Sequence, residues 1–383
     1  MSFFPEGFRA QTLALGLRES GDDCAVVVAD RLCVGAGVFT RSLFAGPSVA
    51  LSRSRLVGGS AQGLVVVAKN ANVANGPRGR RDAEEVTALV ASAVGLESDR
   101  ILIASTGVIG RPYPMDSIRA GLGRLAGAPF DATPSDVAVA MMTTDTVPKT
   151  ATQNAGGARL VGVAKGVGMI EPDMATMLAF VFTDALVEAD VLARLWRRAV
   201  DATFNCLSID GDTSTSDTAV VLASGAAGPV DEGELAAALR EVCLDLTLQL
   251  ARDGEGATKL LTVTVRAARD AAQARRVAKS VVNSPLVKTA VHGADPNWGR
   301  VAMAIGKCRD DTDIDPDRVV IRFGDQEAYP ARPGPDGLAA LSEAMKGDHV
   351  DIDVELGTGL AEATVYGCDL SAEYVRINAD YTT

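Results

Sequence analysis

The chain contains very little histidine, with only His292 and His349 among 383 residues. A metal site with three histidine ligands is therefore excluded, and a Ser-His-Asp triad would have only two candidate bases. The six cysteines are scattered singly, with no C-x-x-C pair, which excludes a zinc cluster and gives no sign of a disulfide framework. We expect no metal site, and we expect any catalytic base to be a group other than histidine.

Basic residues and long apolar runs are also scarce. The chain has 37 Lys and Arg against 49 Asp and Glu, a formal net charge of −12, which argues against a general nucleic-acid binder. No run approaches the ~20 apolar residues that a membrane helix needs. The first residues, MSFFPEGFRAQ, lack the basic and apolar regions of a secretory signal. The sequence predicts a soluble, cytoplasmic protein with no nucleic-acid or membrane partner.

Short runs rich in β-branched residues interleave with amphipathic windows along the chain. This mixture, without a strict βαβ alternation, predicts a mixed α/β or α+β fold. The expected strands are 24–29, 64–68, 101–104, 160–164, 177–182, 218–223, 261–265, 319–323 and 350–356. The expected helices are 83–94, 114–125, 188–203, 232–252 and 267–282.

Two polar stretches are candidates for a site. Residues 141–146 (MMTTDT) are dense in hydroxyl groups, and residues 104–110 (ASTGVIG) directly follow an expected strand. A strand that ends in Thr-Gly exposes backbone N–H groups, which are suited to hold a developing oxyanion. Taken alone, both stretches are more commonly ordinary turns, because Ser, Thr, Asp and Gly favour turns.

Residues 171–180 (EPDMATMLAF) place Thr176 before an apolar run. Such a threonine is ordinarily a strand residue without chemistry. The functional interpretation is that the chain cuts its own Ala175–Thr176 bond, so that Thr176 becomes an N-terminal nucleophile. Its hydroxyl then attacks, and its own α-amino group, with a reference pKa of about 7.7–8.0, acts as the base. This chemistry suits a chain that is poor in histidine.

Several motifs together resemble the ornithine acetyltransferase family, the bifunctional glutamate N-acetyltransferases of the cyclic arginine pathway. They extend over nearly the whole chain: STGVIG, MTTDT, VAKG, EPDMATML, DGEGATK, VNSPLVKTAVHGADPNWGR and NADYTT. The resemblance implies a layered α-β-β-α sandwich similar to that of the N-terminal-nucleophile aminopeptidases, and we expect a smaller α/β lobe in the C-terminal half. It also implies self-cleavage into an α chain, 1–175, and a β chain, 176–383. These two chains would stay interlaced in one folded unit and assemble as α₂β₂ or larger.

The resemblance also assigns roles to individual residues. Thr176 would be the nucleophile and, with Ala175, the cleavage point, while Thr106 and Gly107 would form the oxyanion hole. Lys165 would bind a substrate carboxylate and Glu255 an ammonium group, although without the resemblance both would be interpreted as surface charges. The other implied substrate-binding residues are Thr143, Asn378 and Thr383. His292, in the VHGADPNWGR motif, is interpreted as structural.

The implied reaction is a ping-pong transfer of an acetyl group from N-acetyl-L-ornithine to glutamate, giving ornithine and N-acetylglutamate. It needs no acetyl-CoA, metal or other cofactor. Residues 68–76 read AKNANVANG, whereas arginine-pathway members carry a stretch resembling NSGNANACTG. This variant is similar to members from antibiotic gene clusters of the clavulanic-acid type, so a paralogue with another donor or acceptor stays open. An N-terminal-threonine amidase or aminopeptidase and a catalytically inactive binding protein also stay open.

Overall fold

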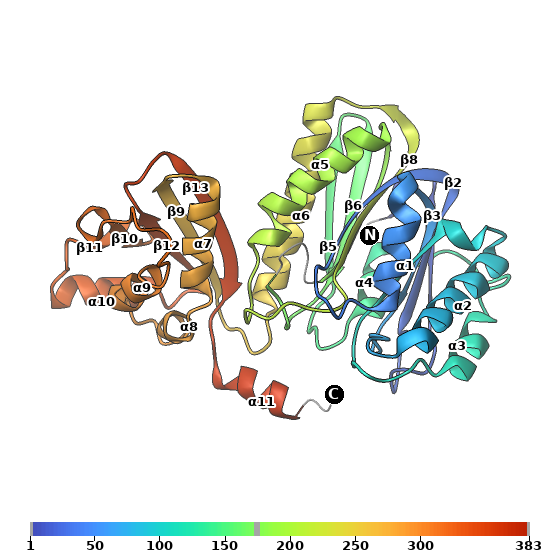
Figure 1. Cartoon of the computed structure of the whole chain (residues 1–383), viewed down its shortest axis with the longest axis horizontal. Helices are drawn as coiled ribbons and strands as arrows, with labels where there is room; N and C mark the ends of the chain where they lie inside the picture. Colours follow the sequence, from blue (N-terminus) through green and yellow to red (C-terminus); the bar gives the residue numbers. More distant parts are fainter. Residues whose placement is uncertain (1–2, 172–176, 381–383) are drawn as a thin grey trace. The chain divides into compact units, whose positions relative to one another are not determined.

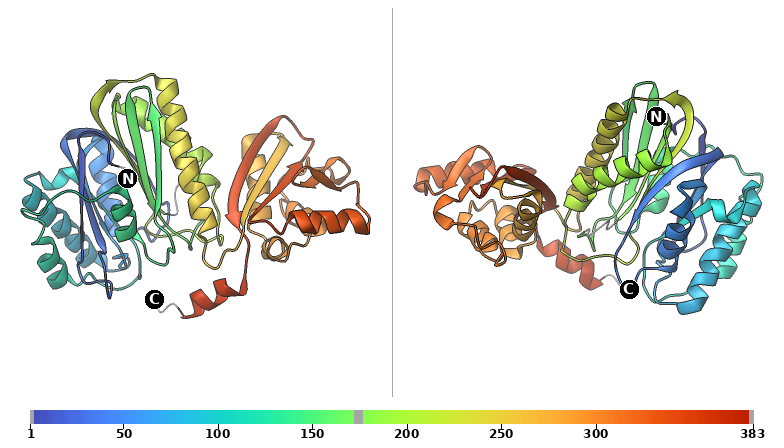
Figure 2. Two further views of the ribbon diagram at one scale, coloured as in Figure 1. Left: turned by 180° about the vertical axis from the view of Figure 1, so that it is seen from behind. Right: turned by 45° about the horizontal axis from the view of Figure 1, so that its top comes forward.

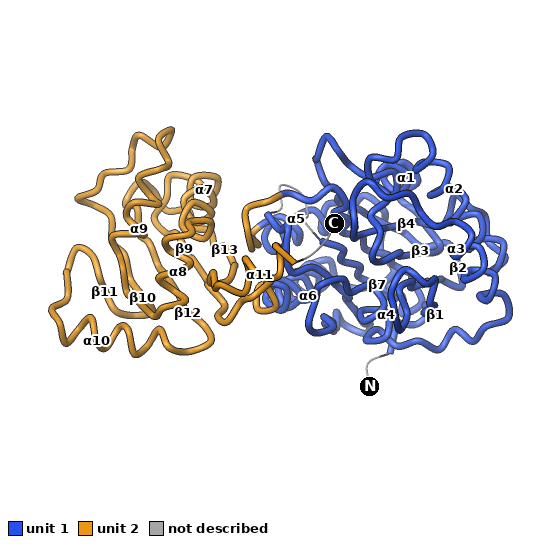
Figure 3. The backbone as a smooth tube through the Cα atoms, turned by 90° about the horizontal axis from the view of Figure 1, so that it is seen from below, with its two compact units in different colours: residues 1–205, 213–250, 383 blue, residues 206–212, 251–382 orange. Residues whose placement is uncertain are grey.

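The computed structural model describes residues 3–171 and 177–380. They form two compact units, which Figure 3 distinguishes by colour. Unit 1 contains the described residues up to 205 together with 213–250, and unit 2 contains 206–212 and the described residues from 251 onward. The predicted cut between residues 175 and 176 does not coincide with the boundary between these units, because the described residues before and after it belong to unit 1.

Unit 1 is built around a sheet whose strand order is β4-β3-β2-β8-β7-β6-β5, with β1 also paired to β2. Its strands are β1 (Phe8–Leu13), β2 (Cys24–Phe39), β3 (Ser60–Val67), β4 (Ile101–Ser105), β5 (Lys149–Ala155), β6 (Ala158–Lys165), β7 (Leu178–Leu186) and β8 (Thr218–Pro229). Its helices are α1 (Pro47–Arg55), α2 (Gly76–Val94), α3 (Met115–Leu122), α4 (Pro134–Met141), α5 (Ala189–Ala202) and α6 (Glu232–Arg252).

The long strand β2 belongs to both halves of this sheet. Its first part pairs with β1 and β3, the register shifts between Val28 and Cys33, and its last part, Val34 to Phe39, pairs with β8. One continuous sheet therefore supplies two β layers that face each other across a shared core. That core contains Val27 and Leu64 from one half and Phe180 and Val220 from the other.

Helices cover the two outer faces of unit 1 (Figures 1 and 2). On one side, residues of α2 and α3 such as Val86 and Ile118 pack with Val65 and Ile103 of β3 and β4. On the other side, α6 lies so close to β6 that a Cβ on Gly162 would be 2.7 Å from Val242. The layer order is therefore α-β-β-α, as predicted.

Unit 2 is smaller and has its own sheet in the order β11-β10-β12-β9-β13. Its strands are β9 (Leu260–Ala268), β10 (Val320–Phe323), β11 (Gln326–Tyr329), β12 (His349–Glu355) and β13 (Ala361–Cys368). Its helices are α7 (Ala271–Val282), α8 (Pro285–His292), α9 (Trp298–Ile305), α10 (Pro335–Ala344) and α11 (Ala372–Asp380). Val263 and Ile352 of the sheet and Val277 of α7 belong to one core cluster. The prediction of a smaller α/β lobe in the C-terminal half is confirmed.

Candidate active site

Three of the predicted site residues meet at the end of β6. Lys165 is the last residue of that strand, and only 7% of its surface is exposed. Its Nζ donates to Thr143 Oγ1 at 2.8 Å and to Thr106 Oγ1 at 3.4 Å. The structure therefore brings together side chains from three separate segments, and Lys165 is a nearly buried cation rather than a surface charge.

Thr106 and Gly107 follow β4 directly. The N–H of Thr106 donates to the Val67 carbonyl at 3.1 Å and is therefore not available to an oxyanion. The Thr106 hydroxyl, in contrast, faces Lys165. Gly107 has φ +132°, and a Cβ there would lie 2.1 Å from the carbonyl carbon of Lys69. Only glycine fits this position. The Thr106 hydroxyl and the Gly107 N–H, which has no backbone acceptor among the described residues, are the candidate oxyanion donors.

Asp145 organises the cluster, a role that the sequence did not reveal. It accepts hydrogen bonds from Lys149 Nζ at 2.8 Å, the Gly166 N–H at 2.7 Å and the Thr143 N–H at 3.0 Å. Burial alone would raise its pKa, but the ammonium groups of Lys165 and Lys149 and these hydrogen bonds hold the pKa of Asp145 well below its ordinary value. Asp145 is therefore a fixed anion that anchors both the Thr143 loop and the end of β6.

The cluster carries more positive than negative charge. Lys69 donates to the Thr143 carbonyl oxygen. Burial and then the nearby cations Arg18 and Lys165 lower the pKa of Lys69, which is the expected effect of cations crowded together. The Asp145 carboxylate is opposed by three ammonium groups, those of Lys69, Lys149 and Lys165. This surplus suits a ligand that brings a carboxylate of its own.

The predicted cleavage residues Ala175 and Thr176 lie outside the described residues. Met177 is the first described residue after them, and its carbonyl accepts from the Thr218 N–H at 2.9 Å. The next residue, Leu178, begins β7 and pairs with Lys165. Asp217, which precedes β8, is 1% exposed, and burial raises its pKa well above the ordinary value.

Two other predicted residues meet in unit 2. Asn378, on α11, donates through Nδ2 to Glu255 Oε2 at 2.9 Å, although 123 positions separate them in the chain. The pKa of Tyr374 is raised to about 12, chiefly because the phenol is partly buried and further because the carboxylates of Asp210 and Glu255 are nearby. Thr383, another predicted substrate-binding residue, lies outside the described residues.

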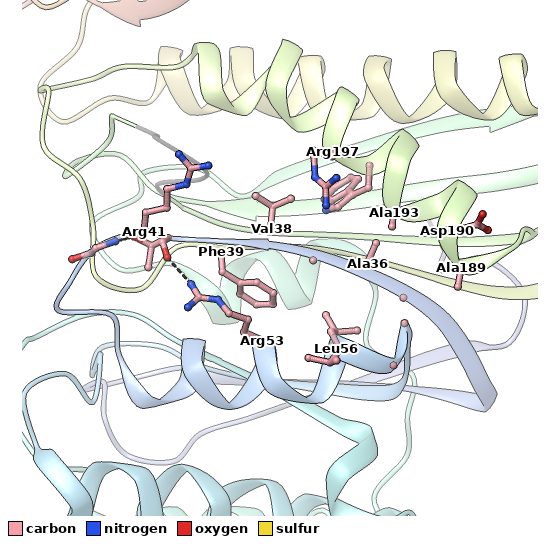
Figure 4. A pocket seen from close by; sticks show the side chains of 18 residues that line it. Ala36, Val38, Phe39, Arg41, Arg53, Leu56, Ala189, Asp190, Ala193 and Arg197 are labelled. Carbon is pink, nitrogen blue, oxygen red and sulfur yellow. Dashed lines mark hydrogen bonds between the residues drawn. The ribbon is translucent and has the colours of Figure 1, made fainter.

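A separate cavity of about 770 Å³ lies in unit 1 between the end of β2, α1 and α5. Figure 4 shows Arg41, Arg53 and Arg197 among its side chains, with Arg53 bonded to the Thr40 carbonyl at 2.6 Å. Thr106, Thr143 and Lys165 are not among the residues that line it. The cavity therefore gives unit 1 a second basic surface, which is separate from the cluster of Thr106, Thr143 and Lys165.

The described residues contain no group of three or more His, Cys, Asp and Glu side chains placed to hold a metal ion. Within the same residues, no helix is both long and apolar enough to cross a membrane. Sequence reasoning missed Lys69, Asp145 and Lys149 as members of the cluster. The spacing of Asp145 and Lys149, four positions apart, was the available signal, but it does not reveal burial.

Comparison with known proteins identifies the family of the chain. The ArgJ family model matches residues 9–383. The arginine biosynthesis bifunctional protein ArgJ 2 of Nostoc sp. is 56% identical, with 99% of this chain and 98% of that protein covered. The glutamate N-acetyltransferase Oat2 of Streptomyces clavuligerus is 54% identical over the same shares. A crystal structure of argJ from Bacillus halodurans is 39% identical, covering 52% of this chain and 96% of that chain with a TM-score of 0.49. The chain belongs to the ArgJ family.

Proposed function

We propose that this protein transfers an acetyl group from N2-acetyl-L-ornithine to L-glutamate. Family membership over residues 9–383 supports this function, as do relatives named bifunctional arginine biosynthesis proteins and glutamate N-acetyltransferase. The observation that carries the proposal is the contact of Lys165 with both Thr106 and Thr143 at the sheet end where β7 begins. This cluster combines hydroxyl donors with surplus positive charge, as an acyl-amino acid requires.

The nucleophile in this proposal is Thr176, after cleavage of the Ala175–Thr176 bond. Its hydroxyl attacks the acetyl carbonyl, and its own α-amino group accepts the proton. The Thr106 hydroxyl and the Gly107 N–H stabilise the oxyanion, and collapse of the tetrahedral intermediate expels ornithine, whose amine takes the proton. In the second half, the glutamate amine attacks the carbonyl of the threonine ester, the bond to the Thr176 oxygen breaks, and the proton that the amine loses passes through the α-amino group to that oxygen as N-acetylglutamate is released. Because the α-amino group of Thr176 is the base in this proposal, neither of the two histidines of the chain is needed for that role.

Charged groups bind the ends of the amino acids in this proposal. Lys165, supported by Lys69, binds a carboxylate, and Thr143 contacts the substrate through the hydroxyl that Lys165 already orients. Glu255 binds an ammonium group, with Asn378 fixing one of its oxygens. Asn378 and Thr383 together form a C-terminal pair of substrate-binding residues in this proposal. The implied ligands are N-acetylornithine, ornithine, glutamate and N-acetylglutamate.

We further propose that the mature protein consists of an α chain, 1–175, and a β chain, 176–383, assembled as α₂β₂ or larger in the cytoplasm. The pairing of β6 with β7 supports two interlaced chains, because these strands stand on either side of the cut and share six register pairs from Leu160 to Lys165. A break between them leaves the sheet hydrogen bonds that join the two chains in place.

A second candidate is a paralogue with another acyl-amino acid donor or acceptor, as in an antibiotic gene cluster. Its support is that the variant stretch 68–76 enters the cluster, since Lys69 bonds to the Thr143 carbonyl. The variation therefore falls where substrate would bind. The match to the Streptomyces clavuligerus protein fits this candidate as well. Thr176 chemistry is the same in both.

Denaturing mass spectrometry of the wild type tests cleavage directly. We expect two polypeptides, one that ends at Ala175 and one that begins at Thr176, and we expect Thr176→Ala to be soluble, uncut and inactive. A wild type that runs as one intact chain contradicts the proposal, as does cleavage that persists in Thr176→Ala.

An acetylornithine assay with and without glutamate separates transferase from amidase. We expect ornithine release in multiple turnovers only when glutamate is present, with N-acetylglutamate formed in equal amount. Release that is indifferent to glutamate indicates a hydrolase. A panel of acetylated donors and amine acceptors then distinguishes the arginine-pathway enzyme from the paralogue.

A further inference from the structure

A buried carboxylate in unit 2 joins three segments that the proposed mechanism does not use. The Asp369 side chain is 0% exposed and directly follows β13. Its Oδ1 accepts from the Thr258 N–H at 2.7 Å and the Lys259 N–H at 2.9 Å. Its Oδ2 accepts from the Thr258 hydroxyl at 2.5 Å and contacts His292 Nδ1 at 2.7 Å.

The chemistry of this group assigns its donors. Burial alone would raise the pKa of Asp369, but the Thr258 hydroxyl, the two backbone N–H groups and His292 hold it below the ordinary value. An ionised carboxylate only accepts, so the proton between the two side chains belongs to His292 Nδ1. Asp369 is a fully bonded anion and therefore a rigid anchor for whatever is attached to it.

The loop that Asp369 anchors carries Glu255. Thr258, bonded to Asp369 through both backbone and side chain, ends this loop just before β9. On its other side the loop packs on the start of α11. Gly256 has φ +70° and a Cβ there would lie 2.5 Å from the Tyr374 backbone nitrogen, while the Ser371 hydroxyl donates to the Gly256 carbonyl at 2.6 Å. The backbone around Glu255 is therefore held from two sides.

We propose that His292 and Asp369 are positioning residues that fix the Glu255 carboxylate for an incoming ammonium group. This inference rests on the proposed function, in which Glu255 binds the amine end of the amino acid. Asp369 holds the loop, and His292 supplies the fourth hydrogen bond to Asp369. Neither acts on the acetyl group. The histidine of the VHGADPNWGR motif therefore sets affinity for one class of ligand, α-amino acids with an ammonium group.

The kinetic signature follows from where Glu255 acts. An ammonium contact is present in the bound amino acid and in the transition state alike, so loosening it raises KM and leaves kcat nearly unchanged. His292 has 43% of its side chain exposed, so its replacement removes little core packing. A merely structural role would instead lower folded protein and kcat together.

Replacing His292 with Leu or Asn isolates the hydrogen bond. Leu removes the donor, whereas the Asn side-chain amide presents an N–H near the position of Nδ1. We expect His292→Leu to raise the ornithine dissociation constant and the KM for acetylornithine about tenfold, with kcat within twofold. We expect His292→Asn to restore both within about threefold, and Thr258→Val to behave like His292→Leu.

His349 offers a matched control. It is 41% exposed and lies 2.8 Å from the Thr262 hydroxyl and 3.1 Å from Asp351, which repeats the His-Thr-Asp chemistry in the same unit. These contacts do not reach Asp369 or the loop that carries Glu255. His349→Leu should therefore leave ornithine binding and turnover at wild-type values.

Calorimetry with L-ornithine and the acetyl-transfer assay together separate the two proposals. Equal ornithine affinity in His292→Leu and wild type overturns the positioning role, whatever the transfer assay gives. Equal loss in His292→Leu and His349→Leu overturns it too, because the effect would then not be specific to Asp369. Tenfold weaker ornithine binding confined to His292→Leu and Thr258→Val supports it. A wild type that binds ornithine but transfers no acetyl group contradicts only the proposed reaction.

Discussion

The substitution Asp145→Asn removes the carboxylate that organises the Lys165 cluster. The Asp145 and Lys149 side chains are both 0% exposed and 2.8 Å apart, so the change leaves a buried ammonium group without its counter-ion. Removal of one partner of a buried pair costs about 3–5 kcal/mol, because the remaining charge stays desolvated. The Val147 carbonyl, 3.2 Å from Lys149 Nζ, is a neutral acceptor and does not replace the lost charge. We expect the free energy of unfolding to fall by about 3–5 kcal/mol.

The double variant Asp145→Asn, Lys149→Met tests whether this loss is electrostatic. It removes both buried charges, and such replacements are often close to neutral. We expect it to recover most of the loss and to lie within about 1–2 kcal/mol of wild type. Neighbouring residues usually show a coupling energy of about 0.5–3 kcal/mol. A larger coupling between these two substitutions would show that the ion pair is as desolvated as its exposed fraction indicates.

Activity should not recover with stability. Asp145 also accepts from the Thr143 and Gly166 N–H groups and lies 4.0 Å from Lys165 Nζ. The double variant should fold, but without that anion Lys165 and the Thr143 loop are held less firmly in place. We therefore expect KM to rise about tenfold, which corresponds to a loss of about 1.4 kcal/mol of binding free energy. Urea unfolding at constant m-value and steady-state kinetics measure the two effects. A loss below about 1 kcal/mol in Asp145→Asn, or single losses that simply add in the double variant, would refute the reasoning.

Three further predictions concern the oxyanion segment and Asp217. Thr106→Val should lower kcat about 10²-fold with KM nearly unchanged, while Thr106→Ser retains most activity; an unaltered kcat in Thr106→Val counts against the hydroxyl as a donor. Gly107→Ala places a Cβ 2.1 Å from a Lys69 backbone carbon and should destabilise by about 3 kcal/mol, whereas Gly110→Ala, at φ +81° with nothing within 4 Å, should cost about 1 kcal/mol; equal thermal shifts would contradict this account. Because the folded pKa of Asp217 is raised from 3.8, its stabilisation is complete below about pH 4 and is lost as pH rises through the folded value, by at most about 1.4 kcal/mol per pH unit. Unfolding of Asp217→Asn from about pH 4 to about pH 8 should lack that decline, and parallel profiles for the variant and wild type would show that Asp217 does not cause it.

Hydrophobic patterning predicted the interior of the fold well, because buried elements repeat one period over several turns. In α6, Leu235, Leu239, Val242 and Leu246 recur at steps of three or four and are all at most 1% exposed. Short elements with weak patterns were missed, among them β1, β5, α1 and α4. The helix α4 has only eight residues, and its start depends on a capping box between Thr133 and Asp136 rather than on a long apolar stripe.

The site was predictable by resemblance and much less by residue chemistry. Lys165 reads as a surface charge in isolation, because no local pattern shows that β6 ends among buried polar groups. Asp145 reads as a turn residue for the same reason. The contact of Glu255 with Asn378 depends on where the chain returns after 123 positions, and that return is set by the packing of unit 2 and not by any local signal.

The strand order of unit 1 determines how much of the chain must be synthesised before its sheet can form, and this bears on when the proposed cleavage can occur. In the order β4-β3-β2-β8-β7-β6-β5, strands β7 and β8, which follow the predicted cut, are inserted between β2 and β6, which precede it. A ribosome therefore has to release the chain as far as Ala223, which pairs with Val34, before β2 can complete its pairing. The N-terminal half cannot finish its sheet while it is the only part synthesised, because Phe39 pairs with Thr218.

Pairing across so long a separation is slow compared with local helix formation. A cut at Thr176 made before this pairing would give two pieces that each lack sheet neighbours, whereas a cut made afterwards leaves the two pieces joined for the life of the fold. Cut chains that remain joined are therefore chains that had paired β2 with β8 before the proposed self-cleavage, whereas Thr176→Ala, which we expect to fold without being cut, leaves no such record.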